Sequence, residues 1–206
     1  MRVALLGGTG AFGIALAARL REAGYDVVIG SRDAERASAA AAELGVEGMA
    51  NDDAARSAEL VVLATNAEAA LATAEQLQEA IGEKPLLCVA SGLRFTQAGV
   101  LPDADALSLA ERVQRVVAGP VVAGLHSLGA RSLGAERAPE EDALVCGDDE
   151  DSKSVALELA GRITGGRAVD AGPLASARAL EGLTAVLVNV NKRYKAHAGI
   201  KLTGLP

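Results

Sequence analysis

Three glycines near the start of the chain have the spacing of a turn that binds a dinucleotide. Gly8, Gly10 and Gly13 follow the pattern Gly-x-Gly-x-x-Gly. In such a turn the first glycine permits a tight bend, the second lets the backbone approach a pyrophosphate, and the third lets a helix pack closely on a strand. The helix that follows offers free N–H groups to phosphate oxygens. The pattern therefore predicts a site for a dinucleotide cofactor.

The stretch that follows the second expected strand lacks the acid of an NAD site. An Asp or Glu there usually holds the ribose hydroxyls of NAD, but this chain has Gly30, Ser31 and Arg32, with Arg36 one helical turn later. A guanidinium can bind two phosphate oxygens through charge-assisted hydrogen bonds, and the hydroxyls of Ser31 and Thr9 can add to them. The arrangement suits a 2′-phosphate, and so predicts NADP(H) rather than NAD(H).

Other residue types that carry out chemistry are scarce. The two histidines and two cysteines do not have the spacing of a metal site, and no Ser-His-Asp pattern stands out, so no metal is predicted. His126 follows an apolar strand and can polarise a carbonyl of a second substrate as a hydrogen-bond donor, although a lone histidine is more often structural. His197 is expected to be a surface residue. Hydride transfer suits such a chain, since it needs two aligned rings rather than a nucleophile.

The glycine turn lies between elements typical of a Rossmann-type fold. Residues 2–6 form an apolar run that predicts a strand, residues 14–22 have apolar residues at helical spacing, and residues 26–29 predict a second buried strand. Two strands joined by one helix pair in parallel. The fold class predicted is α/β, with a doubly wound parallel sheet.

The alternation of strands and helices continues along the chain. Further strands are expected at residues 60–64, 86–89, 121–123, 143–145 and 168–169. Further helices are expected at residues 34–44, 51–58 with Asn51 as N-cap, 68–80, 106–116, 151–163 and 174 to about 195. The stretch from residue 93 to the helix at 106 is rich in Gly, Pro and Asp and is expected to be a loop.

The composition sets the class of protein and its partners. A chain of 206 residues with half of them apolar predicts one or two associated globular domains. The formal net charge of -7 argues against a nucleic-acid partner, because phosphate backbones require a clustered cationic face. No stretch has the length of a membrane span or the form of a signal peptide, so we expect no membrane partner and a cytoplasmic protein. Cys88 and Cys146 are expected to be buried, reduced thiols.

Several segments spread along the chain resemble the family of NADPH:coenzyme F420 oxidoreductases, also called F420-dependent NADP reductases. They are RVALLGGTG (2–10), VVIGSRD (27–33), NDDAA (51–55), GLHSLGA (124–130), VCGDDEDSK (145–153), VDAGPLASAR (169–178) and LEGLTAVLVNVNKRYKAHAGIKLTGL (180–205). The resemblance implies reversible hydride transfer between NADPH and the 5-deazaflavin F420. It also implies an NADP-binding Rossmann domain (1–124) and a small C-terminal α/β lobe (125–206) that covers the nicotinamide and deazaflavin site.

The resemblance implies roles for individual residues. The cofactor is expected to be bound by the glycine turn with Gly8, Thr9, Gly10, Ala11, Phe12 and Gly13, by Ser31, Arg32 and Arg36 at the 2′-phosphate, by Ala67, Leu71 and Ser91 on the ribose and nicotinamide side, and by Ala130, which closes that pocket. His126 and Leu128 are expected to face the deazaflavin ring. The chain departs from the family where members often carry Pro and an aromatic residue at Asn66 and Ala67, or Pro at Gly92 and Gly129.

The last expected helix ends in a basic cluster formed by Lys192, Arg193 and Lys195. Cations at a helix C-terminus usually offset the helix dipole, but they can also steer the anionic tail of F420. The apolar stretch 183–190 on the same helix makes a homodimer plausible. Two other functions stay open, a reductase that uses NADPH with an imine, ketone or flavin acceptor, and a non-catalytic sensor that binds NADP.

Overall fold

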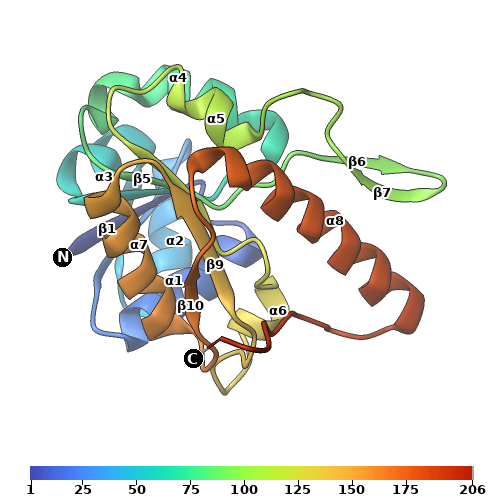
Figure 1. Cartoon of the computed structure of the whole chain (residues 1–206). Coiled ribbons are helices and arrows are strands. Elements are labelled where there is room, and N and C mark those ends of the chain that lie inside the picture. The colour runs from blue at the N-terminus through green and yellow to red at the C-terminus, as the bar shows by residue number, and fades with distance from the viewer. Residues whose placement is uncertain (206) are drawn as a thin grey trace.

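The computed structural model describes residues 1–205, and these residues are built around one twisted sheet (Figure 1). Its strands are β1 (Arg2–Leu6), β2 (Asp26–Ser31), β3 (Glu47–Ala50), β4 (Leu60–Leu63), β5 (Leu86–Cys88), β8 (Val121–Gly124), β9 (Ala143–Gly147) and β10 (Ala168–Asp170). They lie in the order β10-β9-β8-β5-β4-β1-β2-β3. A separate antiparallel hairpin is formed by β6 (Leu93–Thr96) and β7 (Gly99–Pro102).

Most of the helices connect strands, and the last helix follows the last strand. The helices are α1 (Ala11–Glu22), α2 (Ala34–Leu44), α3 (Asn51–Ser57), α4 (Ala67–Ile81), α5 (Leu109–Gln114), α6 (Ala130–Leu133), α7 (Glu150–Ile163) and α8 (Ala177–Tyr194), with a 3-10 turn at Leu174–Ser176 before α8. None of the helices within residues 1–205 is long and apolar enough to cross a membrane.

Neighbouring strands are parallel with one exception. β1 pairs in parallel with β2 and β4, and β5 pairs in parallel with β4 and β8. β9 runs antiparallel to β8, with Ala123 opposite Cys146. The connection between them contains only the four-residue α6, which is too short to carry the chain back across the sheet for a parallel return. The predicted α/β class and Rossmann-type sheet are confirmed, and the sheet is mainly rather than wholly parallel.

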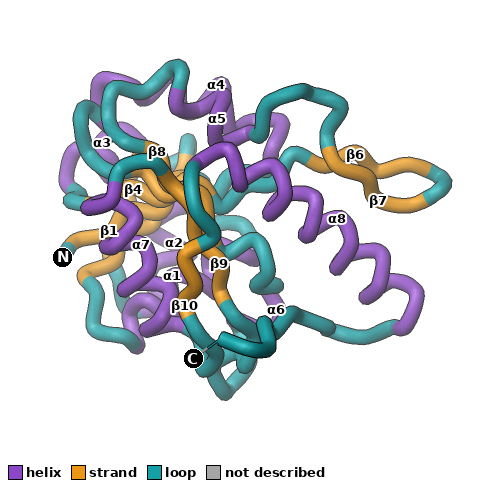
Figure 2. Tube along the Cα trace, viewed as in Figure 1, coloured by secondary structure: helices purple, strands orange, loops and turns teal. Residues whose placement is uncertain are grey.

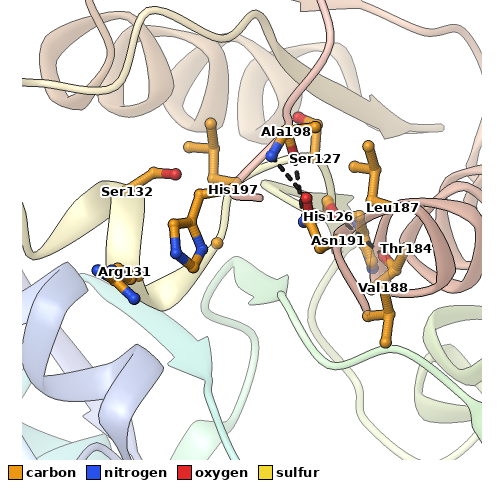
Figure 3. A pocket seen from close by; sticks show the side chains of 12 residues that line it. His126, Ser127, Arg131, Ser132, Thr184, Leu187, Val188, Asn191, His197 and Ala198 are labelled. Carbon is orange, nitrogen blue, oxygen red and sulfur yellow. Dashed lines mark hydrogen bonds between the residues drawn. The ribbon is translucent and has the colours of Figure 1, made fainter. Parts of the chain in front are cut away.

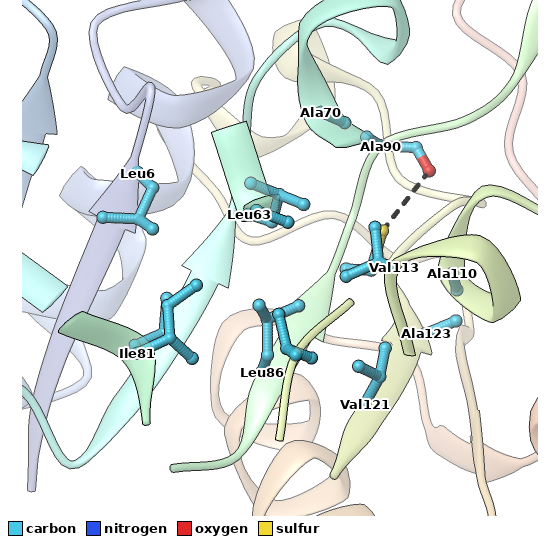
Figure 4. Packing of buried hydrophobic residues seen from close by; sticks show 14 of the residues in the cluster. Leu6, Leu63, Ala70, Ile81, Leu86, Ala90, Ala110, Val113, Val121 and Ala123 are labelled. Carbon is cyan, nitrogen blue, oxygen red and sulfur yellow. Dashed lines mark hydrogen bonds between the residues drawn. The ribbon is translucent and has the colours of Figure 1, made fainter. Parts of the chain in front are cut away.

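The core has two apolar layers, one on each face of the sheet. Successive strand residues alternate between faces, so Leu6, Leu63, Leu86 and Val121 lie in one layer and Leu5, Val62, Leu87 and Val122 in the other. Helices α4 and α5 cover the first layer with side chains such as Ile81 and Val113 (Figure 4). Helices α1 and α7 cover the second with Leu16 and Leu159. Burial on both faces explains why the central strands are continuous apolar runs.

Some local predictions were wrong, each for an identifiable reason. The expected loop after residue 93 contains the β6–β7 hairpin, and β3 has too few apolar residues to reveal an edge strand. The helix expected at 106–116 begins later, because Ser108 caps α5 through a capping box with Glu111. Asn51 is the first residue of α3, and the N-cap is Ala50.

Helix α8 and the hairpin form an arm that projects from the sheet (Figures 1 and 2). The side chain of Asn189 joins them, since its Oδ1 accepts a hydrogen bond from Val100 N at 2.8 Å and its Nδ2 donates to Val100 O at 2.7 Å. The boundary expected after Gly124 falls at the end of β8, and β9 and β10 continue the same sheet beyond it.

Candidate functional site

Three cavities follow one another along the edge where the parallel strands end. The first lies beside the glycine turn and the ends of β2 and β4, and its lining includes Thr9, Gly10, Ser31, Arg32, Arg36 and Asn66. The second lies beside the ends of β4 and β5 and includes Phe12, Thr65, Ala67, Ser91 and Phe95. The third lies beside the end of β8, between α6 and α8, and includes His126, Leu128, Arg131, Asn191 and His197. Ligands of open α/β sheets bind at this edge.

The glycine turn has the geometry that its spacing predicts. A Cβ on Gly13 would lie 2.6 Å from the carbonyl oxygen of Gly8, so only glycine lets α1 start against the turn. A Cβ on Gly10 would meet nothing within 4 Å, so its backbone is open on the side of the first cavity. Gly7 has a φ of +71°, and its Cβ would lie 2.5 Å from Thr65 Cγ2. Gly7 lies outside the Gly-x-Gly-x-x-Gly pattern, although it directly follows β1.

The first cavity offers two guanidinium groups without ion-pair partners. Arg32 and Arg36 are exposed, and neither belongs to an ion pair within residues 1–205. Two acids, Asp33 and Glu35, lie between these arginines in sequence. Asp33 is the N-cap of α2, and its carboxylate accepts hydrogen bonds from Glu35 N at 3.0 Å and Arg36 N at 3.2 Å. Asp33 therefore serves the helix, and the cavity keeps the cationic character that a phosphate requires.

Two residues that the sequence analysis did not place in the site belong to it. Asn51 lines the first cavity, and its Oδ1 accepts a hydrogen bond from Gly7 N at 3.2 Å, which braces the glycine turn. The hydroxyl of Thr65 is buried without a partner in residues 1–205, and Thr65 lines both the first and the second cavity. An unpartnered buried hydroxyl is costly unless a ligand completes it. The available signal was a polar residue two positions after the apolar strand β4, which ends at Leu63.

The second cavity contains only part of the set expected on the ribose and nicotinamide side. Ala67 and Ser91 line it, together with Phe12. Leu71 is half-buried against the core, and Ala130 is the first residue of α6, which packs against α1; neither is among the residues that line the three cavities. Asn66 caps α4 by accepting a hydrogen bond from Ala69 N at 3.1 Å, so this departure from the family pattern has a local structural role.

His126 and Leu128 both line the third cavity, as expected. The protonation state of the His126 imidazole bears on the donor role expected for it. His126 is 5% exposed, and its Nε2 lies 3.3 Å from Ala90 O. Burial lowers the pKa of His126 to about 4, so the ring is neutral near pH 7. A carbonyl only accepts hydrogen bonds, so Nε2 carries the proton. The buried Nδ1, which has no partner within residues 1–205, is then an acceptor. The donor role expected for His126 would need the other tautomer.

The basic cluster lies outside the third cavity. Lys192, Arg193 and Lys195 are exposed at the end of α8, and the helix contributes Asn191 to the lining instead. Asn191 Oδ1 accepts a hydrogen bond from Ala198 N at 2.6 Å, which folds the following residues back across the cavity. Arg131 and His197 lie on the opposite side from Thr184 and Val188 (Figure 3).

Comparison with known proteins identifies the family. Residues 2–92 match the family model described as NADP oxidoreductase, coenzyme F420-dependent. The F420-dependent NADP reductase of Methanothermobacter thermautotrophicus is 37% identical over an alignment of 226 positions, which covers 100% of this chain and 96% of that protein. The chain belongs to the F420-dependent NADP reductase family. The Methanocaldococcus jannaschii member is 36% identical, with 100% of this chain and 99% of that protein covered.

The fold of this F420-dependent NADP reductase family member also matches solved structures. A provisionally named F420-dependent NADP reductase from Arthrobacter sp. FB24 superimposes with a TM-score of 0.83 and 28% identity, and the match covers 96% of each chain. Because almost the entire chain is covered, the agreement is not confined to its N-terminal half. The resemblance predicted from the sequence is thus confirmed along the whole length of the chain.

Proposed function

We propose that this chain is an oxidoreductase that transfers hydride between NADP(H) and the 5-deazaflavin coenzyme F420. The main support for this proposal is that relatives named F420-dependent NADP reductases are 36–37% identical across the whole chain. The three adjacent cavities support the assignment, since they provide room for an extended dinucleotide and a second ring along one edge of the sheet.

The residues present suit NADP(H) on structural grounds. The open backbone at Gly10 and the start of α1 provide N–H groups for a pyrophosphate. The guanidinium groups of Arg32 and Arg36, with the hydroxyl of Ser31, would hold the 2′-phosphate. The unpartnered hydroxyl of Thr65 lies where the first and second cavities meet, and a ligand that spans both would complete it.

Each cavity has a separate task in this assignment. NADP(H) supplies or accepts the hydride at its nicotinamide ring. Ala67 and Ser91 would bound the ribose and nicotinamide side, with Leu71 and Ala130 supporting that region from behind. His126 and Leu128 would contact the deazaflavin, and Lys192, Arg193 and Lys195 would attract its anionic tail. The division into residues 1–124 and 125–206 is then functional, with the later part bringing F420 to a cofactor bound by the earlier part.

The test is an assay with competing acceptors. Purified protein with NADPH and oxidised F420 should bleach the deazaflavin absorbance, and reduced F420 with NADP should restore it. FMN, simple ketones and cyclic imines belong in parallel assays, because Asn66, Gly92 and Gly129 depart from the family pattern at the cavities. Turnover with one of those acceptors and none with F420 would assign a different reductase. Binding of NADPH without any turnover would assign a sensor.

We also propose a homodimer that forms through the arm. Its exposed apolar side chains include Phe95, which is 74% exposed, and Val186, which is 55% exposed. A second copy suits this surface, because a symmetric contact would bury the exposed apolar side chains of both arms at once. Sedimentation should give twice the monomer mass. The double variant Phe95→Ser with Val186→Ser should shift the protein towards monomer, whereas a wild-type monomer at micromolar concentration would contradict the proposal.

We propose a cytoplasmic location because both cysteines are free thiols. Cys88 and Cys146 are both free and buried, and burial raises the pKa of each thiol to about 12. Free thiols persist in reducing compartments. Fractionation of the source cells, with blotting for the protein, tests this location.

A further inference from the structure

A pair of hydroxyl groups forms the wall between the second and third cavities. Ser91 lines the second cavity and Thr184 of α8 lines the third. Their oxygens are 3.1 Å apart. Thr184 Oγ1 also lies 3.0 Å from His126 O and 3.3 Å from Leu180 O. Figure 3 shows Thr184 on the same side of the third cavity as His126.

The two carbonyls fix the direction of this hydrogen-bond chain. A carbonyl oxygen only accepts, so the single proton of Thr184 is used by His126 O or Leu180 O. Ser91 must then donate its own proton to Thr184. The Ser91 hydroxyl makes no other hydrogen bond within residues 1–205, so both of its lone pairs are free. Ser91 is thereby an acceptor towards the second cavity.

The backbone on both sides of Ser91 is anchored as well. His126 Nε2 donates to Ala90 O at 3.3 Å, and Gly92 N donates to Glu181 Oε2 at 3.1 Å. Glu181 is 4% exposed, and its other oxygen accepts from Leu109 N at 2.7 Å. Glu181 and Thr184 are neighbours along α8. A loop held by three side-chain contacts, with one oriented hydroxyl, is preorganised for a specific partner.

We propose that Thr184 is a positioning residue that keeps the Ser91 hydroxyl as an acceptor for the carboxamide N–H of NADP(H). The inference rests on the proposed function, since it takes NADP(H) as the ligand of the second cavity. The carboxamide is the group on the nicotinamide ring that donates hydrogen bonds. The chain then recognises the nicotinamide end of the cofactor through Ser91, which lies outside the glycine motif and is oriented by Thr184 of α8.

The test compares two ligands that differ in that N–H group. The 3-acetylpyridine analogue of NADP keeps the carbonyl oxygen but replaces the amide nitrogen with a methyl group. Calorimetric titration without F420 should show that the wild type prefers NADP by about threefold to tenfold, the value of one neutral hydrogen bond. Thr184→Val, which is similar in volume, and Ser91→Ala should lose that preference by weakening NADP alone. Thr184→Ser keeps the hydroxyl and should restore it.

Several outcomes would overturn the proposal. If the wild type binds both ligands equally, it makes no hydrogen bond to the carboxamide N–H. If Thr184→Val weakens the binding of both ligands equally, the role of Thr184 is purely structural. Unchanged ligand preference in both variants, together with a raised Michaelis constant for F420, would assign the contact to the deazaflavin. Failure of F420 turnover in wild type with the ligand preference intact would count against the proposed function but not against this contact.

Discussion

Asp142 and Arg167 form an ion pair that joins the start of β9 to the start of β10 and holds the C-terminal residues. Arg167 Nη2 lies 2.8 Å from Asp142 Oδ2, and Asp142 Oδ1 accepts from Arg167 N at 2.9 Å. Leu202 N donates to Asp142 Oδ2 at 2.7 Å. The hydrogen bonds from the Arg167 side chain, followed by those from the two backbone N–H groups, hold the pKa of Asp142 well below its usual range.

This depressed pKa predicts a pH-dependent contribution to stability. A carboxyl that is more acidic in the folded than in the unfolded state stabilises the fold above its unfolded pKa of about 4, and this stabilisation is lost as the pH falls below that value. Asp142→Asn should therefore lower Tm by several degrees at pH 7, and its difference from wild type should shrink in acid. Amide exchange around residues 200–205 should accelerate. The exposed Glu75→Gln serves as control, and a pH-independent difference would contradict the prediction.

The unpaired arginines of the first cavity predict cofactor preference. Arg36→Ala should weaken NADPH binding by about tenfold to a hundredfold and hardly change NADH, because a lost hydrogen bond between charged groups costs roughly 1.5 to 3 kcal/mol. Arg56→Ala is a matched control, since Arg56 is exposed and pairs with Asp52 on α3. Fluorescence titration with both cofactors measures the effect. Equal losses for NADPH and NADH would remove the 2′-phosphate assignment.

The buried imidazole of His126 predicts a second pH effect. Its pKa is lowered from 6.5 to about 4 by burial, so between these values the unfolded state binds a proton that the folded state does not. The free energy of unfolding should fall by up to about 3 kcal/mol as the pH drops through that window. His126→Gln should flatten this slope in urea denaturation. Parallel pH curves for wild type and variant would show that His126 is charged or accessible in the fold.

The basic cluster at the end of α8 predicts salt-sensitive use of F420. Replacement of Lys192, Arg193 and Lys195 by Gln should raise the Michaelis constant for F420 at low salt and leave NADPH binding unchanged, because exposed charges act through screened attraction. A control removes the same charge elsewhere, with Gln in place of Arg56, Arg115 and Arg162. An unchanged Michaelis constant at low salt, or an equal effect of the control, would leave the cluster as a solvated helix end.

The central sheet could be predicted from the sequence because its strands carry local signals. Residues 60–63 are apolar on both faces, and glycines and helix caps delimit their neighbours. The β6–β7 hairpin gave no such signal, since three of the four residues of β6 are exposed and the hairpin is held by Asn189, far along the chain. The reversal of β9 depends on the length of the connection before it, which hydrophobic periodicity does not encode.

The site was predictable where a short sequence segment carries each part of it. Arg32, Arg36 and Thr9 lie in the first cavity as their spacing indicated. Thr184 and Glu181 could not be recognised, because their roles depend on Ser91 and Gly92, which lie about ninety residues earlier in the sequence. An Asn before an alanine-rich stretch predicts a helix cap, whereas the amide oxygen of Asn51 accepts a hydrogen bond from Gly7 N.

The reversed direction of β9 has a practical consequence for attaching other proteins to this chain. Because β9 runs against β8, its first residues lie at the edge where the parallel strands end, and the hydrogen bonds of Asp142 bring Leu202 to that edge too. A fluorescent protein or affinity tag joined behind Leu205 would therefore emerge near the residues that close the third cavity. Met1 precedes β1 and lies at the opposite edge (Figure 1). Surface immobilisation or labelling through the N-terminal end leaves the cavities facing free solution.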